Sequence, residues 1–245
     1  MQPIGPEFME KTRYRHLPPS NQQRHLPAPP LELPRDPAQP TVALPPPTRL
    51  ESRPLVLREL IERRRSVRQY ADRPIRLEEL SYLLWCTQGV PQAMGDLASL
   101  RTVPSAGGRH AFETYLLVHR VDGLVAGLYR FLAMDHALAE VSTDPRIAEA
   151  VTDACLGQDF VRSGAVTFVW SAVPYRMTWR YGQRGYRYLH LDAGHVCQNL
   201  YLAAESIGCG VCAVAAFDDE ALAAALGLDG RQQFPIYVAA VGRKP

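Results

Sequence analysis

The sequence lacks the features of a membrane-spanning, exported or disulfide-bonded protein. It has no run of eighteen or more apolar residues, and its N-terminus does not show the charged, apolar and small-residue regions of a secretion signal. Its five cysteines are an odd set in a chain of 245 residues, which fits free thiols better than a disulfide framework. We therefore expect a cytoplasmic protein with no membrane partner.

A strong excess of charge of one sign is also missing. Lys and Arg total 27 against 25 for Asp and Glu, which leaves a net charge of +2. A protein so close to neutral is poorly suited to a phosphate-rich polymer. Residues 179–188 mix cations with aromatic side chains that could stack on bases, but one such patch is more often a loop or lid. We therefore expect no nucleic-acid partner.

Proline is plentiful but gathered at one end of the chain. Residues 1–54 hold 14 of the 21 prolines, a density that opposes regular helix and central strand, so we expect an extended tail there. Its first eight residues, MQPIGPEF, resemble an expression-vector remnant, which makes Met9 a candidate natural start. Residues 55–245 are expected to form one folded domain.

Apolar spacing in residues 55–245 predicts helices around a buried sheet. A helix is expected to begin near Leu57, and leucines three and four residues apart predict another over 77–88. Further helices are predicted over 192–207 and 219–226. Short apolar runs rich in β-branched or aromatic residues predict strands over 114–121, 165–173, 211–217 and 235–241. No period of twenty to fifty residues recurs, so the pattern indicates an α+β domain.

The segment GCGVCA at 208–213 matches two well-known patterns without their structural setting. A dinucleotide-binding G-x-G-x-x-A turn follows a strand and opens a helix, whereas here a helix ends and a strand begins. Cys209 and Cys212 have C-x-x-C spacing, but they enter a predicted strand and no second ligand pair completes a zinc site. We expect buried cysteines and no metal. The glycines fit a helix cap and tight turn, or a backbone lying against a ligand.

Arg64, Ser66 and Arg68 alternate along an extended segment, so their side chains should point the same way. Two guanidinium groups and a hydroxyl suit a phosphate, although the same residues also fit a solvated basic helix end. The small, turn-forming residues from Pro104 to Gly108 would let the backbone approach a flat ligand closely.

Taken in order, these pieces resemble the nitroreductase superfamily and, within it, the SagB-type dehydrogenases, which include oxidases of thiazolines and oxazolines. The resemblance covers residues 55–243. It implies a nitroreductase-like α+β fold, in which helices flank a central, mostly antiparallel sheet, and an intertwined homodimer with FMN at the subunit interface. It rests on these segments: RRRSVRQY (63–70), RTVPSAGGRH (101–110), LGQDFV (156–161), RYGQRGYRYLHLDAGHVCQNLYLAAESIG (180–208), AAFDD (215–219) and VGRKP (241–245).

The resemblance also implies which residues bind the flavin. One subunit would contact the phosphate, ribityl and pyrimidine groups, and would face the isoalloxazine with the backbone of a turn. Those residues are Arg64, Ser66, Arg68, Gly208, Cys209, Gly210 and Arg243, the last of which would hold the phosphate. The other subunit would reach the same flavin through Pro104, Ser105 and Ala106.

In azoline-oxidising members a Lys-Tyr pair precedes a segment like YGQR, and this chain has Arg180 and Tyr181 there. Arginine stays protonated under ordinary conditions, so Arg180 could orient a substrate or stabilise an anion but could not readily act as a base. Tyr181 is the better candidate for proton transfer.

Three functions are compatible with the sequence. The leading hypothesis is FMN-dependent dehydrogenation of an azoline or similar heterocycle, free or carried on a peptide or carrier protein, with oxygen reoxidising the flavin and with biosynthetic enzymes as partners. The second is NAD(P)H-dependent reduction of a nitro compound or quinone. The third is a catalytically idle flavin-binding or docking module whose proline tail recruits a partner enzyme.

Overall fold

The computed structural model describes residues 3–50, 56–95 and 98–245. A seven-stranded sheet with the order β1-β6-β5-β4-β7-β9-β8 lies at its centre, and every neighbouring pair in this sheet is antiparallel. The strands are β1 (Thr41–Ala43), β4 (Phe112–Val118), β5 (Gly127–Leu132), β6 (Ala137–Ser142), β7 (Val166–Ala172), β8 (Cys209–Val214) and β9 (Phe234–Arg243). A separate hairpin pairs β2 (Gln92–Met94) with β3 (Ala98–Leu100).

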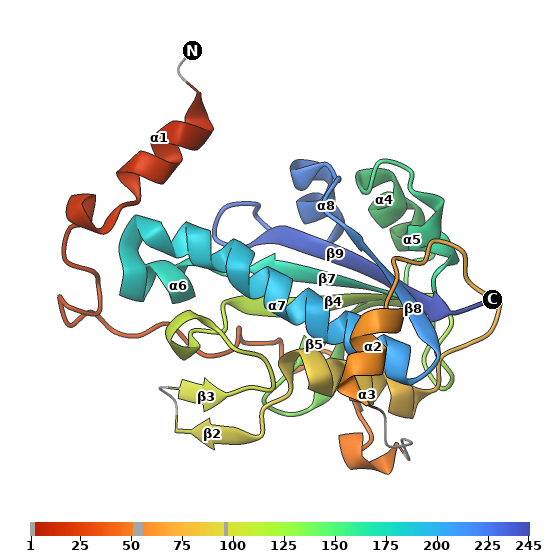
Figure 1. Ribbon diagram of the computed structural model, residues 1–245. Coiled ribbons are helices and arrows are strands. Elements are labelled where there is room, and N and C mark those ends of the chain that lie inside the picture. The colour runs from red at the N-terminus through yellow and green to blue at the C-terminus, as the bar shows by residue number, and fades with distance from the viewer. Residues whose placement is uncertain (1–2, 51–55, 96–97) are drawn as a thin grey trace.

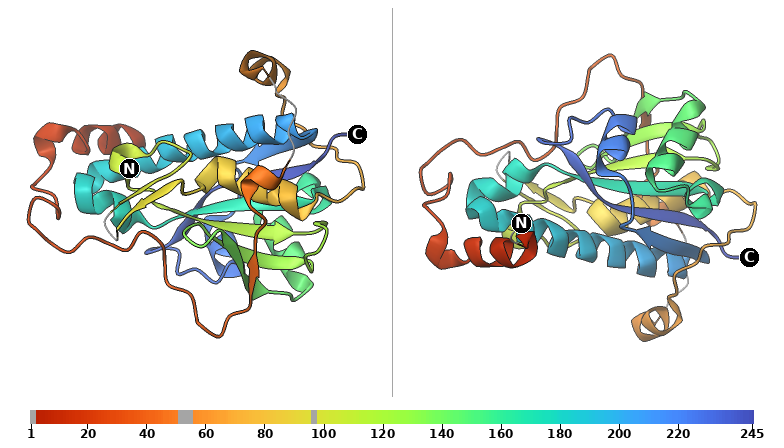
Figure 2. Two further views of the ribbon diagram at one scale, coloured as in Figure 1. Left: turned by 90° about the horizontal axis from the view of Figure 1, so that it is seen from below. Right: turned by 90° about the horizontal axis from the view of Figure 1, so that it is seen from above.

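Helices cover both faces of the sheet (Figures 1 and 2). The α-helices are α1 (Ile4–Lys11), α2 (Leu57–Arg63), α3 (Leu77–Gln88), α4 (Arg146–Ala154), α5 (Asp159–Ser163), α6 (Pro174–Tyr181), α7 (Gly185–Ser206) and α8 (Asp219–Ala225). Short 3-10 turns are formed by η1 (Tyr14–His16), η2 (Pro47–Arg49), η3 (Ala106–Gly108) and η4 (Gly182–Arg184). The predicted α+β fold class is confirmed.

Two apolar cores lie on opposite faces of the sheet. Along β4, Leu116 and Val118 pack with residues of α3 and α7, whereas Tyr115 and Leu117 pack with residues of α4 and α8. Because both faces of β4 and β7 are buried, these strands are continuous apolar runs instead of alternating patterns. This pattern is the reason that both strands could be predicted from the sequence.

Residues 179–188, expected as a loop or lid, are instead almost wholly helical. They contain the end of α6, the turn η4 and the beginning of α7, which extends seven residues further toward the N-terminus than predicted. Arg176, Met177 and Trp179 of α6 are buried, so tertiary packing stabilises a segment whose mixed charges and aromatics gave no clear helical signal.

The proline-rich tail begins with α1, which projects from the body of the molecule, and then runs along the folded domain (Figure 1). Its strand β1 pairs with β6 as an edge strand of the main sheet. Prolines were expected to exclude regular helix from residues 1–54, and α1 departs from this expectation. The one proline within α1, Pro6, stands in the first turn, where the backbone N–H of a helix has no internal partner and its absence costs nothing.

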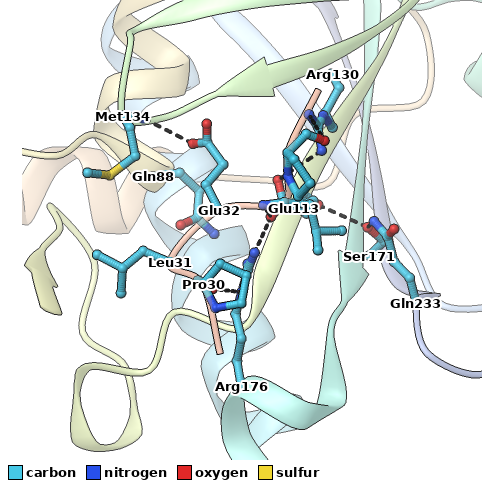
Figure 3. A network of polar contacts seen from close by, with 12 residues as sticks. Pro30, Leu31, Glu32, Gln88, Glu113, Arg130, Met134, Ser171, Arg176 and Gln233 are labelled. Atoms are coloured by element: carbon cyan, nitrogen blue, oxygen red, sulfur yellow. Dashed lines mark hydrogen bonds and ion pairs between the residues drawn. The ribbon is translucent and has the colours of Figure 1, made fainter. Parts of the chain in front are cut away.

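A buried ion pair anchors the tail, as Figure 3 shows. Glu113 of β4 and Arg176 of α6 are almost inaccessible to solvent, and their charged atoms lie 2.6 Å apart. Arg176 also donates to the carbonyl of Pro30 at 2.8 Å, and the Glu113 carboxylate accepts the backbone N–H of Leu33 at 2.9 Å. A proline-rich segment cannot pair with the sheet as a regular strand, because proline has no N–H to donate. The backbone groups of Pro30 and Leu33 are instead bound by the buried side chains of Arg176 and Glu113.

We expect Glu113→Gln to lower the free energy of unfolding by about 3–5 kcal/mol, because it leaves the Arg176 guanidinium buried without a counter-charge. Denaturant unfolding measures the change, and faster tryptic cleavage at Arg35 would report release of the tail. Asp159→Asn, which removes an exposed pair with Arg162, is the control and should cost less than about 1 kcal/mol. Equal stability of the two variants would contradict the proposed role of the buried pair.

Candidate functional site

Residues 64–71 cross the β8 edge of the sheet and reach the end of β9. Val67 N–H donates to the carbonyl of Val211 at 2.9 Å, and Ala71 N–H donates to the carbonyl of Arg243 at 3.0 Å. This pairing holds the segment extended. Arg64, Ser66 and Arg68 stand at alternate positions along it, and all three remain partly or fully exposed. Only Arg64 and Ser66 meet at one place, so the expectation that all three side chains point the same way does not hold for Arg68.

Arg64 and Ser66 gather around Tyr201 of α7. The Arg64 guanidinium lies 5.4 Å from the centre of the Tyr201 ring, and Ser66 Oγ is 3.0 Å from its hydroxyl. That hydroxyl also accepts the backbone N–H of Ala213 in β8 at 3.0 Å. Arg68 lies apart from this group, 5.9 Å from the centre of the Phe160 ring. Sequence reasoning missed Tyr201, which connects α7, β8 and the 64–68 segment.

The two glycines of the GCG segment have different roles. Gly208 follows the end of α7 with φ at +73°, and a Cβ built there would meet open space, so the backbone is accessible. At Gly210, by contrast, a Cβ would lie 2.6 Å from Cβ of Val67. Packing against Val67 therefore explains Gly210 without a ligand. Between them, Cys209 is buried, and this burial raises the pKa of its thiol to about 11.

Arg243, at the end of β9, is already engaged within the chain. Its guanidinium forms an ion pair with Glu79 and donates to the carbonyl of Ile207 at 3.1 Å and to that of Pro74 at 3.3 Å. Three of its five N–H groups are thus occupied. Arg64 and Arg68 differ, because no carboxylate of the described residues lies within 4.0 Å of either guanidinium.

The predicted loop from Pro104 to Gly108 is held by a buried carboxylate. Ser105 Oγ donates to Asp192 of α7 at 2.6 Å, and the backbone N–H of Ala106 donates to the same carboxylate at 3.2 Å. Burial raises the pKa of Asp192, while these two hydrogen bonds act in the opposite direction. Sequence reasoning missed Asp192. Its signal was a charged residue on the apolar stripe that contains Leu189, Ala193 and Val196.

Arg180 and Tyr181 pack directly against this loop. Gly107 has φ at +59°, and a Cβ there would come within 3.0 Å of both the Tyr181 hydroxyl and Arg180 Nε. Arg180 is exposed and Tyr181 is half-buried. The Tyr181 ring meets that of Tyr188 edge to face, with 4.8 Å between centroids. The structure therefore joins the pair expected to act on substrate with the loop expected to reach a flavin.

One chain does not bring all the predicted residues together. Asp192, beneath the Pro104–Gly108 loop, and Tyr201, beside Arg64, are nine residues apart on α7. At about 1.5 Å and about 100° per residue, they are separated by about 14 Å and by half a turn. The chain thus carries two half-sites on opposite edges of one helix. We call them the cation half-site (Arg64, Ser66, Arg68 and Tyr201) and the loop half-site (Pro104–Gly108, Arg180, Tyr181 and Asp192).

Metal and thiol chemistry receive no support from the part of the chain that the structure describes. No group of three or more His, Cys, Asp or Glu side chains there is arranged to hold a metal ion. All five cysteines are free, and burial raises the pKa of Cys155 to about 11 and that of Cys197 to about 12. Within the same residues, no helix is both long and apolar enough to cross a bilayer.

Comparisons with known proteins agree on one family. A model of the nitroreductase family matches residues 61–243. A protein of Methanocaldococcus jannaschii named as a candidate nitroreductase is 35% identical over 188 residues, which cover 77% of this chain and 91% of that protein. The microcin B17-processing protein McbC of Escherichia coli is 28% identical over 144 residues, so this chain spans 52% of McbC and the match covers 56% of this chain. A solved structure of a candidate nitroreductase from Ralstonia eutropha has a TM-score of 0.70 at 27% identity, covering 90% of this chain and 99% of that one.

Gly210→Ala should push the 64–68 segment away from β8, because its new Cβ cannot coexist with Val67 at 2.6 Å. We expect a loss of about 1–3 kcal/mol in the free energy of unfolding, the usual cost of overpacking. Val67→Gly in the same chain vacates that space and should restore part of the loss. Denaturant unfolding of the two single variants and the double variant measures both effects, and strictly additive losses would show that the two residues are not in contact.

Proposed function

The chain belongs to the nitroreductase family of oxidoreductases, and we propose that it is an FMN-dependent dehydrogenase that converts an azoline, such as a thiazoline or oxazoline, into an azole in natural-product biosynthesis. The similarity to McbC, a microcin-processing protein, supports this substrate class. The observation that carries the proposal is the packing of Arg180 and Tyr181 against the Pro104–Gly108 loop.

The residues of the two half-sites fit FMN. The Arg64 guanidinium is free of carboxylate partners among the described residues, so its charge is available to a phosphate; Arg68 is likewise unpaired there, but it lies apart beside Phe160. Arg243 shares its charge with Glu79 and would contribute through its remaining N–H groups. Gly208 is exposed and lacks a Cβ, so a flat ring could approach its backbone closely. When bound, FMN would supply the two-electron acceptor for the reaction.

The loop half-site would handle the substrate. An azoline becomes an azole by losing a hydride and a neighbouring proton, so a group is needed to receive that proton. Tyr181 presents a hydroxyl beside Gly107, and Arg180 places a fixed positive charge next to it. Arg180 would orient the substrate through its planar fork, since a guanidinium does not act as a base.

The complete site would lie between two copies of the chain. In one subunit the half-sites lie on opposite edges of α7, and exposed apolar residues flank this helix. Leu191 of α7 and Leu57 of α2 are each 60% exposed, and α2 projects from the body of the molecule in both views of Figure 2. A second copy would cover these residues and place its loop half-site against the cation half-site of the first. We therefore propose a homodimer.

The competing functions are distinguishable. The name of the Methanocaldococcus relative favours a reductase, in which NAD(P)H reduces the flavin and a nitro compound or quinone is the acceptor. A docking module with a free proline tail fits less well, because the tail carbonyl of Pro30 and the N–H of Leu33 are bound by the buried Arg176–Glu113 pair.

Rapid anaerobic mixing tests the activity. A synthetic 2-aryl-thiazoline should bleach the flavin absorbance of the FMN-loaded protein and yield the thiazole, whereas NADPH should not. Tyr181→Phe should keep its FMN and lose about a hundredfold to ten-thousandfold in rate, as is typical of a lost general acid or base. Tyr186→Phe, a half-buried phenol outside the loop half-site, is the matched control. Bleaching by NADPH with no thiazoline oxidation would establish the reductase instead.

Mixed dimers test the composite site. Arg64→Ala should weaken FMN binding by about tenfold to a hundredfold, whereas Arg65→Ala, whose guanidinium binds backbone carbonyls, should bind FMN like the parent. Arg64→Ala and Tyr181→Phe subunits are then mixed at an FMN concentration that fills parental sites but leaves Arg64→Ala sites largely empty. Half of the dimers are mixed, and each of these has one intact site. About a quarter of the parental rate should return. No recovery would mean that Arg64 and Tyr181 serve the same site from one chain.

A further inference from the structure

A cavity of about 500 Å³ lies between the N-terminal tail and the end of α6. One side is formed by tail residues within 14–23, which we call the tail wall, and the other side by Arg180 and Tyr181. The two domain residues that line this cavity are therefore those that the proposed function places at the substrate. The tail wall is part of the space that a substrate would enter.

Hydrogen bonds and stacking fix the tail wall at both ends. At one end the Tyr14 hydroxyl is 2.7 Å from that of Tyr188, and the Arg184 guanidinium lies 4.3 Å from the centre of the Tyr14 ring. At the other end Gln22 N–H donates to the carbonyl of Trp179 at 2.9 Å, and Trp179 Nε1 donates to the carbonyl of Leu26 at 3.0 Å. Trp179 directly precedes Arg180, and Arg184 and Tyr188 follow Tyr181 within seven residues, so the tail wall is fixed on both sides of the pair.

The surroundings of Arg180 lack negative charge. Residues 11–31 contain no aspartate or glutamate, so the tail wall contributes none. Within the described residues, no carboxylate lies within 4.0 Å of the Arg180 guanidinium, which is exposed. Asp192, on the far side of the loop, is occupied by Ser105 and Ala106. The cavity thus combines an uncompensated planar cation with the apolar surface of Leu17 and Pro18.

We propose that this cavity binds the substrate by a carboxylate group, which pairs with Arg180, while the tail wall covers the adjoining ring. A guanidinium binds a carboxylate through two parallel N–H donors, a geometry that a lysine does not provide. The proposal deepens the proposed function by naming a substrate feature, and it makes the tail a determinant of specificity.

Calorimetric titration with benzoate and with benzamide, which has the same shape without the charge, tests the binding without any turnover. We expect benzoate to saturate one site per subunit and to bind at least about tenfold more tightly than benzamide. Arg180→Gln should abolish this preference. Equal affinity of the parent for both probes, or an unchanged preference in Arg180→Gln, would overturn the proposal.

The tail wall is tested separately by Leu17→Trp, which fills the cavity and should weaken both probes by about tenfold or more. Val125→Trp, at an exposed position between β4 and β5, is the control and should leave both affinities unchanged. Resistance of Arg24 to trypsin checks that the wall stays docked in the variant. Unchanged benzoate affinity in a docked Leu17→Trp would remove the wall from the site. Because no reaction is involved, these outcomes do not depend on whether thiazolines are oxidised.

Discussion

The half-turn between the two edges of α7 is the constraint on which the functional arrangement depends. A helix of 22 residues is rigid enough to hold Tyr201 and Asp192 about 14 Å apart and facing different ways. Tyr201 then contacts the side chain of Ser66 in the 64–68 segment, whereas Asp192 holds the loop around Ser105. A single chain thus presents two unlike surfaces on opposite edges of one helix, and the proposed homodimer would bring one surface of each subunit together.

The Glu113–Arg176 pair has a comparable role for the cavity. Burying two charges is costly, so the pair is retained for what it positions: backbone groups of the tail that have no other partner. Because the tail is held at Pro30 and Leu33, the residues before them stay close to α6. There the backbone N–H of Gln22 donates to the carbonyl of Trp179. The shape of the cavity therefore depends on the buried ion pair, although the pair and the cavity involve different parts of the tail.

The sequence predicted what local patterns determine, and it missed what distant contacts determine. Helix α3 was predicted over its full length because its leucines lie three and four residues apart. Strand β7 was predicted because burial of both its faces makes it a continuous apolar run. The helical state of 179–188 was missed, since it depends on burial of Arg176 against Glu113, 63 positions away. Asp192 is likewise 87 positions from Ser105, so nothing near it in sequence indicates its role. The order of motifs along the chain predicted the candidate site residues. Their division between two edges of α7 could be seen only from the packing of the folded chain.

Two segments from the first third of the chain also lie at the edges of the sheet. At one edge, the three residues of β1 pair with β6. At the other, the 64–71 segment contacts β8, where the N–H of Val67 donates to the carbonyl of Val211. An uncovered edge strand is a template for pairing with other chains. Here one edge ends in a strand of only three residues, and the other is contacted by the 64–71 segment. The segment that carries Arg64 and Arg68 thus also guards against strand-mediated aggregation. Any change that loosens this stretch of backbone would therefore expose part of β8 as well as move Arg64.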